Sequence, residues 1–263
     1  MIDSHCHLLF DSLKKEFPRI IKRANNNNIT AILSINTRME DFQSHYKLIE
    51  DYKSIFISCG QHPENVTNKN IVSVEELIFT SNNNEKVIGI GETGVDLFHS
   101  KDYVQSQCKS FENHIEACIE TNLPLIVHQR DSESQIIDIL SNYKSYSLPL
   151  VMHCFTGSKK LRDFCIESNY YISLSGIATF NSANDLRDII RDIPLKLLLI
   201  ETDAPFLSPV PMRGKTNEPS FVRYTGEFLS KFFNVSLSEF EKITDNNFYK
   251  LFSKAIRYKE ISK

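Results

Sequence analysis

Short apolar runs of strand length recur eight times along the chain, and segments with helical spacing separate most of them. The runs are MIDSHC at 1–6, AILSIN at 31–36, IFISCG at 55–60, VIGIGE at 87–92, LPLIVH at 123–128, LVMHCF at 150–155, YYISLSG at 170–176 and LKLLLIE at 195–201. Strands that alternate with helices pair in parallel, and eight such units in about 210 residues are typical of a closed barrel. The alternation therefore predicts an α/β fold, a single (β/α)8 TIM-type barrel spanning residues 1–263.

Two helices have boundaries that can be read from the sequence. The apolar pattern between 104 and 118 predicts a helix, and Asn122 followed by Pro124 predicts its end. Ser236 and Glu239 have the spacing of a capping box, which predicts a further helix that continues through 251.

The net charge, the lack of long apolar runs and the cysteine spacing exclude several classes of protein. A net charge of −3 argues against the generally basic surface that coats long nucleic acids. No apolar run reaches about 18 residues, and no basic segment precedes an apolar one at the N-terminus, so we expect a cytoplasmic protein with no membrane span. The six cysteines lack CxxC spacing and are interpreted as reduced thiols.

The first run contains two histidines in an otherwise apolar segment. Side chains alternate along a strand, so Asp3, His5 and His7 are predicted on one face and Ile2, Ser4 and Cys6 on the other. Two imidazoles about 6 to 7 Å apart along a strand can bind one divalent ion. The same alternation turns Cys6, and likewise Cys154 beside His153, away from the site and predicts packing roles for both thiols.

Other polar side chains stand at the carboxyl ends of later runs, where barrel enzymes build their active sites. These residues are Glu92, His128, His153, Glu201 and Asp203. Together with His5 and His7 they provide four imidazoles and two or three carboxylates, which suffice for two divalent ions, with Glu92 placed to bridge them. The expected active site therefore lies at the carboxyl-terminal ends of the strands.

Each of these residues also has a simpler interpretation. His128 and His153 could be neutral core histidines, Asp203 could cap a turn before Pro205, and Glu201 could face the surface. Three further histidines, with polar neighbours in helical or loop segments, are expected at the surface. They are His45, His99 and His114.

A second set of polar residues follows the strands and is expected to ring the mouth of the barrel. His62, Asp96, Arg130 and Arg213 are predicted to contact phosphate or a terminal nucleotide, although Arg130 could equally be an ordinary surface arginine or an ion-paired one. The loop PMRGKTNEPSFVR at 211–223 is locally basic and contains Phe221, so it could combine phosphate attraction with base stacking, or be merely solvated.

Six motifs, in order along essentially the whole chain, resemble those of TatD-type metal-dependent deoxyribonucleases, within the wider amidohydrolase-like metallohydrolases. They are DSHCH at 3–7, GQHPENV at 60–66, GIGETGVD at 89–96, LPLIVHQRDS at 123–132, HCFTGS at 153–158 and IETDAPFLSPVPMRGKTNEPSFV at 200–222. The resemblance implies a TIM-type barrel, a dinuclear divalent-metal centre and hydrolysis of DNA phosphodiesters, often as a 3′–5′ exonuclease.

The resemblance also assigns roles to residues. It makes His5, His7 and Asp203 ligands of one ion, His128 and His153 ligands of the other, and Glu92 the shared carboxylate. The attacking water is expected to be activated by metal, and Asp203 is expected to accept its proton. Glu201 is expected to support the ligands or to help hold a further metal.

The metals and partners follow from the same considerations. Imidazole-rich ligation suits zinc or manganese, whereas phosphoryl chemistry and the resemblance point to magnesium. The expected partner is DNA, at ends or in single strands, with no membrane and no obligate protein partner. Two other functions stay open: hydrolysis of a small amide, ester or aminoacyl bond on the same barrel, and a non-enzymatic metal-stabilised scaffold.

Overall fold

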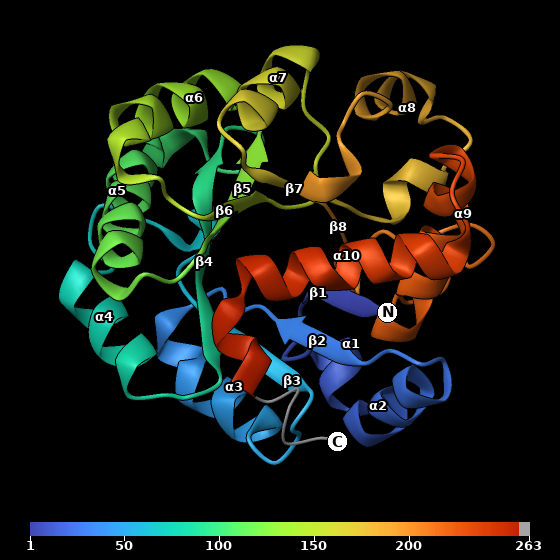
Figure 1. Cartoon of the computed structure of the whole chain (residues 1–263). Helices are drawn as coiled ribbons and strands as arrows, with labels where there is room; N and C mark the ends of the chain where they lie inside the picture. Colours follow the sequence, from blue (N-terminus) through green and yellow to red (C-terminus); the bar gives the residue numbers. More distant parts are fainter. Residues whose placement is uncertain (258–263) are drawn as a thin grey trace.

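The eight predicted strands form one parallel sheet, in sequence order, in a computed structural model that describes residues 1–257 (Figure 1). The strands are β1 (Ile2–Cys6), β2 (Ala31–Ser34), β3 (Ile55–Cys59), β4 (Val87–Asp96), β5 (Leu125–Arg130), β6 (Leu150–Met152), β7 (Tyr171–Leu174) and β8 (Leu198–Ile200). Their order and parallel pairing confirm the predicted eight-stranded barrel.

The sheet closes between β1 and the segment that follows β8. The backbone N–H of Asp203 donates to the carbonyl of His5 at 2.9 Å, and that of His7 donates to the carbonyl of Ala204 at 2.8 Å. Cys6 also forms a parallel bridge with Ala204. Closure therefore brings the two histidines of the first strand next to Asp203, which lies near the other end of the chain.

Helices surround the barrel, as Figure 1 shows. They are α1 (Asp11–Lys14), α2 (Phe17–Asn26), α3 (Phe42–Ile49), α4 (Val74–Asn82), α5 (Val104–Thr121), α6 (Glu133–Asn142), α7 (Lys159–Glu167), α8 (Asn184–Ile190), α9 (Val222–Phe232) and α10 (Leu237–Leu251). The two helix predictions are confirmed. Asn122 ends α5 in a left-handed conformation with φ 57°, and the Ser236 side chain accepts the N–H of Glu239 at the start of α10.

The last long helix covers the amino-terminal end of the barrel. Phe248 and Leu251 of α10, together with Phe252, pack against residues at the beginnings of the strands, such as Ile2 and Phe56. Figure 1 shows α10 crossing in front of the strands. Because apolar side chains fill this end, the carboxyl-terminal end is left to carry polar groups.

The first strand departs from simple alternation. Its register against β2 shifts between Asp3 and Cys6. Ile2 packs inside the barrel, whereas Cys6 packs in the outer cluster with Leu13 of α1, so the prediction that these two side chains share a face was wrong. The orientation of Cys6 away from the site is confirmed. The Asp3 carboxylate accepts the N–H of Thr202 at 2.8 Å instead of facing the histidines.

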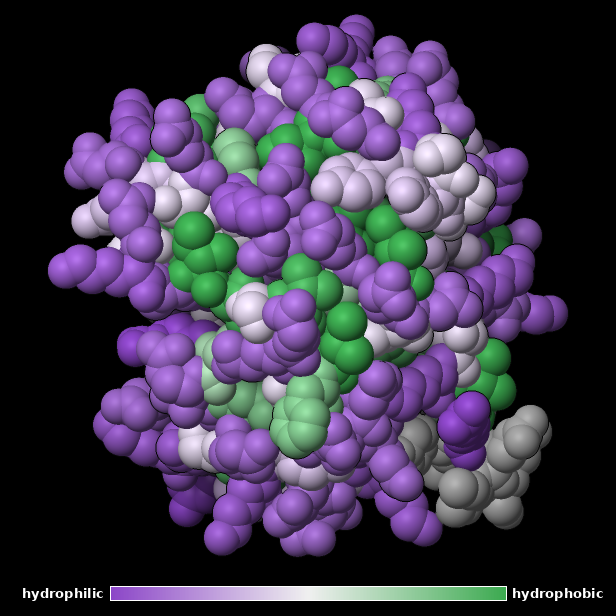
Figure 2. Space-filling model, turned by 90° about the vertical axis from the view of Figure 1, so that its left-hand side faces the viewer, coloured by the Kyte–Doolittle hydropathy of each residue, from purple (hydrophilic) through white to green (hydrophobic). Residues whose placement is uncertain are grey.

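The outer surface is mostly hydrophilic on the face that Figure 2 shows, with small scattered apolar patches. Within residues 1–257, none of the helices combines the length and the apolar character needed to cross a bilayer.

Candidate metal centre

Glu92 lies at the centre of a histidine cluster at the carboxyl-terminal end of the barrel. One carboxylate oxygen, Oε2, is 2.7 Å from Nε2 of His153 and 3.7 Å from Nε2 of His5. The other oxygen, Oε1, is 3.5 Å from Nε2 of His7. The carboxylate therefore contacts histidines of both expected ligand groups, as a bridging carboxylate must.

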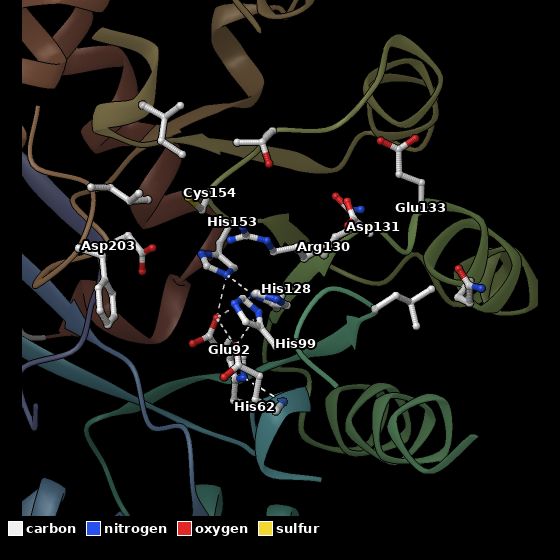
Figure 3. Close-up of a pocket in the computed structure, with 18 of the residues that line it drawn as sticks. His62, Glu92, His99, His128, Arg130, Asp131, Glu133, His153, Cys154 and Asp203 are labelled. Carbon is white, nitrogen blue, oxygen red and sulfur yellow. Dashed lines mark hydrogen bonds and ion pairs between the residues drawn. The ribbon is translucent and has the colours of Figure 1, made fainter. Parts of the chain in front are cut away.

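Two further histidines approach the same carboxylate from β5 and from the loop after β3. Nδ1 of His128 is 3.7 Å from Oε2 of Glu92 and 3.4 Å from Nε2 of His153. Nε2 of His62 is 3.9 Å from the same oxygen. Figure 3 shows these four side chains gathered together. His62, predicted to contact substrate at the mouth, is therefore close enough to the cluster to be a metal ligand as well.

Asp203 completes the group on the β1 side. Its Oδ1 atom is 3.2 Å from Nε2 of His7 and 3.7 Å from Nε2 of His5. The residue has a left-handed backbone with φ 54°, which Asp tolerates better than most side chains. The ligand atoms of His5, His7 and Asp203 all lie within 4.8 Å of one another, close enough to hold one ion.

The imidazole and carboxylate groups of this cluster are suited to bind divalent metal ions. Both ring nitrogens of His5 and Nδ1 of His7 are buried with no hydrogen-bond partner, whereas nearly all buried polar atoms in folded proteins are paired. Burial, together with the neighbouring His153, holds the pKa of His5 well below its usual value, so the ring is neutral and can bind metal. Burial raises the pKa of Glu92, but the surrounding histidines lower it by more.

Glycines flank Glu92 and let β4 approach β5 closely. Gly91 and Gly94 have φ values of 127° and 139°, and a Cβ atom on them would collide with the carbonyl oxygens of Ile126 and His128. Both glycines are therefore positions where only a residue without a side chain permits this close backbone approach. They set the separation between the Glu92 carboxylate and the His128 ring.

Asp96, at the end of β4, orients one of the histidines. The side chain is fully buried, and its Oδ2 atom is 3.0 Å from Nε2 of His128. The backbone N–H groups of Phe98 and His99 donate to its other oxygen at 2.9 and 2.7 Å. The prediction that Asp96 lies at the mouth was wrong, because the residue is enclosed behind His128.

Glu201 occupies the equivalent position behind another histidine. It is fully buried, and its Oε1 atom is 3.4 Å from Nδ1 of His153. The surface-facing alternative for Glu201 is therefore excluded. The contact with His153 matches the expected supporting role, since a carboxylate on the far nitrogen fixes the orientation of an imidazole ligand.

A cavity of about 1160 Å³ opens above the cluster. Its walls include His62 and Asp203 from the cluster and Arg130 from the end of β5 (Figure 3). Arg130 is exposed, as a residue at the mouth should be. Its guanidinium lies 4.4 Å from the centre of the Phe98 ring.

Arg213 lies outside the cavity lining. Its Nη1 atom donates to the carbonyl of Ser208 at 2.9 Å, and its guanidinium stacks 3.8 Å from the centre of the Phe180 ring. Phe221, which the basic loop was expected to offer for base stacking, is partly buried and packs against Tyr224. Neither Arg213 nor Phe221 is among the residues that line the cavity.

Two of the three histidines predicted at the surface are buried. His45 and His114 are fully enclosed: Nε2 of His45 is 2.7 Å from Oγ of Ser34, and Nε2 of His114 accepts the backbone N–H of Gln61 at 3.0 Å. The prediction was wrong for both, because packing partners distant in sequence cover them. His99 is partly exposed, and it lies at the cavity rim.

The position of the Cys154 side chain also differs from the predicted one. The residue has φ 44°, lines the cavity, and its Sγ donates to Oγ of Ser175 at 3.3 Å. The backbone leaves strand geometry at this point, so strand alternation does not set the direction of the side chain. The packing role predicted for Cys154 was therefore wrong.

Sequence reasoning missed the exposed aromatic residues near the mouth, Phe10, Phe98 and Phe206. All three follow strands, in the loops after β1, β4 and β8. A large apolar side chain in a loop just beyond a barrel strand was the available signal.

A parallel barrel with histidines and carboxylates converging at the carboxyl ends of its strands is the arrangement of a metal-dependent hydrolase. The sequence model of the family described as TatD related DNase matches residues 2–253. The chain belongs to this family.

Relatives and solved structures agree with that assignment. The uncharacterized metal-dependent hydrolase YcfH of Escherichia coli K12 is 35% identical and aligns over 96% of this chain and 95% of its own length. YabD of Bacillus subtilis, described in the same words, is 33% identical over 96% and 98%. Among solved structures, the TatD homologue YjjV of E. coli K12 has a TM-score of 0.88 at 27% identity, covering 96% of this chain and 98% of that one.

Proposed function

We propose that this protein is a divalent-metal-dependent deoxyribonuclease that hydrolyses DNA phosphodiester bonds, acting as a 3′–5′ exonuclease. The observation that carries the proposal is the convergence of five histidines on Glu92, two of them also beside Asp203, beneath an open cavity. Membership of a family described as TatD related DNase supports the choice of DNA. The arginine at the mouth gives a phosphate a partner close to the cluster.

In this proposal Glu92 would contribute a ligand to each of two divalent ions. His5, His7 and Asp203 would hold one, and His128 and His153 the other, with His62 within reach of the second group. Bound divalent ions lower the pKa of water and stabilise the charge that develops on a phosphoryl group. Magnesium is the expected ion in use, and zinc or manganese would also suit the imidazole-rich donor set.

Side chains of the protein would perform the remaining steps, which are proton transfer, positioning of the ligands and binding of phosphate. Asp203 lines the cavity and is placed to accept the proton of the attacking water. Glu201 and Asp96 hold the rings of His153 and His128 in place from behind. Arg130 would position a phosphate at the mouth. Because it lies outside the cavity lining, Arg213 would contact only nucleotides beyond the mouth.

The test is a digestion series with end-labelled single- and double-stranded DNA and RNA. Protein stripped of metal is supplied with magnesium, manganese or zinc, and the products are resolved by length. We expect DNA labelled at its 5′ end to shorten stepwise, and chelator or Asp203→Asn to abolish the shortening. The matched control is Asp188→Asn, because this carboxylate is exposed on α8 and is not among the residues that line the cavity.

Two results would contradict the proposal. Metal-loaded protein that leaves every nucleic acid intact but cleaves a small amide, ester or aminoacyl bond would be the alternative hydrolase. Protein that binds metal tightly and hydrolyses none of these substrates would be a metal-stabilised scaffold.

A further inference from the structure

Three exposed phenylalanines stand in the loops that follow β1, β4 and β8. The exposed fractions are 41% for Phe10, 56% for Phe98 and 49% for Phe206. Exposed aromatic side chains cost solvation free energy, and a group of them beside a polar cavity marks a binding surface.

Two of these rings form one platform at the β1 and β8 side of the site. Phe206 lines the cavity, and its ring centre is 5.5 Å from that of Phe10 in an edge-to-face arrangement. Both rings also contact His7, with ring centres 5.4 Å away for Phe10 and 6.5 Å away for Phe206. We call this pair the Phe10–Phe206 platform, and it abuts the candidate metal ligands.

The third ring forms a second platform with Arg130. The guanidinium lies 4.4 Å from the centre of the Phe98 ring, so its charge and its flat face are held together with the aromatic surface. Arg130 and Leu97, which precedes Phe98, line the cavity. We call this pair the Phe98–Arg130 platform.

The two platforms lie on opposite sides of the candidate metal centre. The sheet runs from β1 to β8 in order and closes between its first strand and the segment after its last, so β4 and β5 are diametrically opposite β1 and β8. Glu92 and the histidines lie between the two sides. A phosphodiester at the cluster would therefore have one platform for each of its two flanking nucleosides.

We propose that the platforms stack on unpaired nucleobases, one on each side of the phosphodiester that is cleaved. This inference rests on the proposed function and names the residues that select the substrate. Aromatic rings stack on any base, and an arginine adds charge and cation–π attraction, as in proteins that bind single strands without sequence preference. A base inside a duplex has both faces covered by its neighbours and cannot occupy a platform without leaving the stack.

An acyl chain or other apolar ligand fits the same surface less well. The Phe98 ring is capped by a guanidinium, which an apolar ligand would have to desolvate without compensation. The cavity is also lined by imidazole and guanidinium side chains, including those of His62, His99 and Arg130. A nucleotide satisfies both surfaces, because its base is flat and apolar on its faces and its phosphate is charged.

The test uses a deoxydinucleotide, because it has a single phosphodiester and the flanking bases are unambiguous. The compound is compared with two analogues that lack the base on the 5′ or the 3′ side. We expect Phe206→Ala to lower kcat/KM for the intact dinucleotide about tenfold, chiefly through KM. With one of the two abasic analogues, kcat/KM should be the same for Phe206→Ala and the wild type. With the other analogue, kcat/KM should be the same for Phe98→Ala and the wild type.

Phe79→Ala is the matched control, because Phe79 is 69% exposed on the outer helix α4. It should leave all three rates unchanged. Phe206→Leu removes the ring but keeps most of the apolar bulk, so it replaces the alanine variant if that variant unfolds. Phe206→Trp should retain or improve the rate for the intact dinucleotide.

The outcomes separate the platforms from the function. If the wild type cleaves DNA but the phenylalanine variants lose activity equally on intact and abasic substrates, or lose none, the platforms do not hold bases and the nuclease assignment stands. If the wild type cleaves no nucleic acid, the nuclease assignment fails. Stacking is then judged by quenching of 2-aminopurine in a single-stranded oligonucleotide, and equal quenching by wild type, Phe206→Ala and Phe98→Ala would overturn it.

Discussion

At the residue scale, Glu92 is the side chain on which both halves of the candidate metal centre depend. We expect Glu92→Gln, which keeps the side-chain volume and removes the charge, to weaken divalent-ion binding by more than about tenfold. Substitution of a residue that only supports a metal ligand already lowers metal affinity by about that factor. Metal content after dialysis against fixed ion concentrations measures the effect. Glu75→Gln, on the exposed side of α4, is the control, and an unchanged metal content in Glu92→Gln would contradict the bridging role.

Substitution of Cys6 tests which face of β1 this side chain occupies. The thiol is fully buried in the outer cluster, and its Sγ donates to the carbonyl of Leu33 at 3.7 Å. We expect Cys6→Ser to lower the free energy of unfolding by about 1 kcal/mol or more, because a hydroxyl is costlier to bury than a thiol. Denaturant titration measures this, with half-buried Cys108→Ser as the comparison. Loss of metal in a folded Cys6→Ser protein would show that this residue faces the site.

At the element scale, α5 fixes the loops that carry two of the site residues. Nε2 of His114 accepts the backbone N–H of Gln61, next to His62, at 3.0 Å. The side chain of Gln107 accepts the backbone N–H of Asp96 at 2.8 Å. The helix therefore positions the loop after β3 and the end of β4 together, and a disturbance of α5 should reach the metal centre.

The hydrogen bonds of His114 make this element sensitive to acid. Nδ1–H donates to the carbonyl of Ser110 while Nε2 accepts, so the ring is neutral, and burial lowers its pKa to about 4. The unfolded chain, with the ordinary value of about 6.5, binds a proton that the folded protein excludes, so stability is lost as the pH falls from about 6.5 to about 4. The linked loss reaches about 3 kcal/mol.

We expect His114→Gln to remove that part of the pH dependence. The amide can accept and donate in place of the ring but does not titrate. Denaturant unfolding of both proteins at pH 7.5 and at pH 5, with chelator present throughout, measures the difference, and the other histidines cancel because both proteins contain them. Identical slopes of stability against pH would mean that His114 is protonated in the folded protein.

At the scale of the whole molecule, the candidate ligands tie together strands that are distant in sequence. Glu92 comes from β4, His128 from β5, and His5 from β1, while Asp203 follows β8. Ions that bind only the folded barrel stabilise it by about 2.7 kcal/mol at a free concentration one hundred times the dissociation constant. We therefore expect chelator to lower the melting temperature reversibly, as differential scanning calorimetry can measure. Equal melting with and without metal would contradict a shared site across these strands.

The amino-acid sequence by itself determined the eight strands, the ends of α5 and α10, and the presence of ligand-type side chains at the strand ends. These features are local: apolar periodicity, capping residues and residue type are set by neighbours within a few positions. The resemblance to a known family was readable for the same reason, since its motifs are short segments such as those around His5 and Glu92.

Only the tertiary structure decided which side chains are enclosed and what they touch. The register shift in β1 separates the faces of Ile2 and Cys6, and the left-handed backbone at Cys154 turns its thiol into the cavity. His114 is buried by a loop about fifty residues earlier in the chain, and Phe206 meets Phe10 across the barrel closure. Burial depends on partners that are close in space but remote in sequence, so it becomes definite only when the barrel closes.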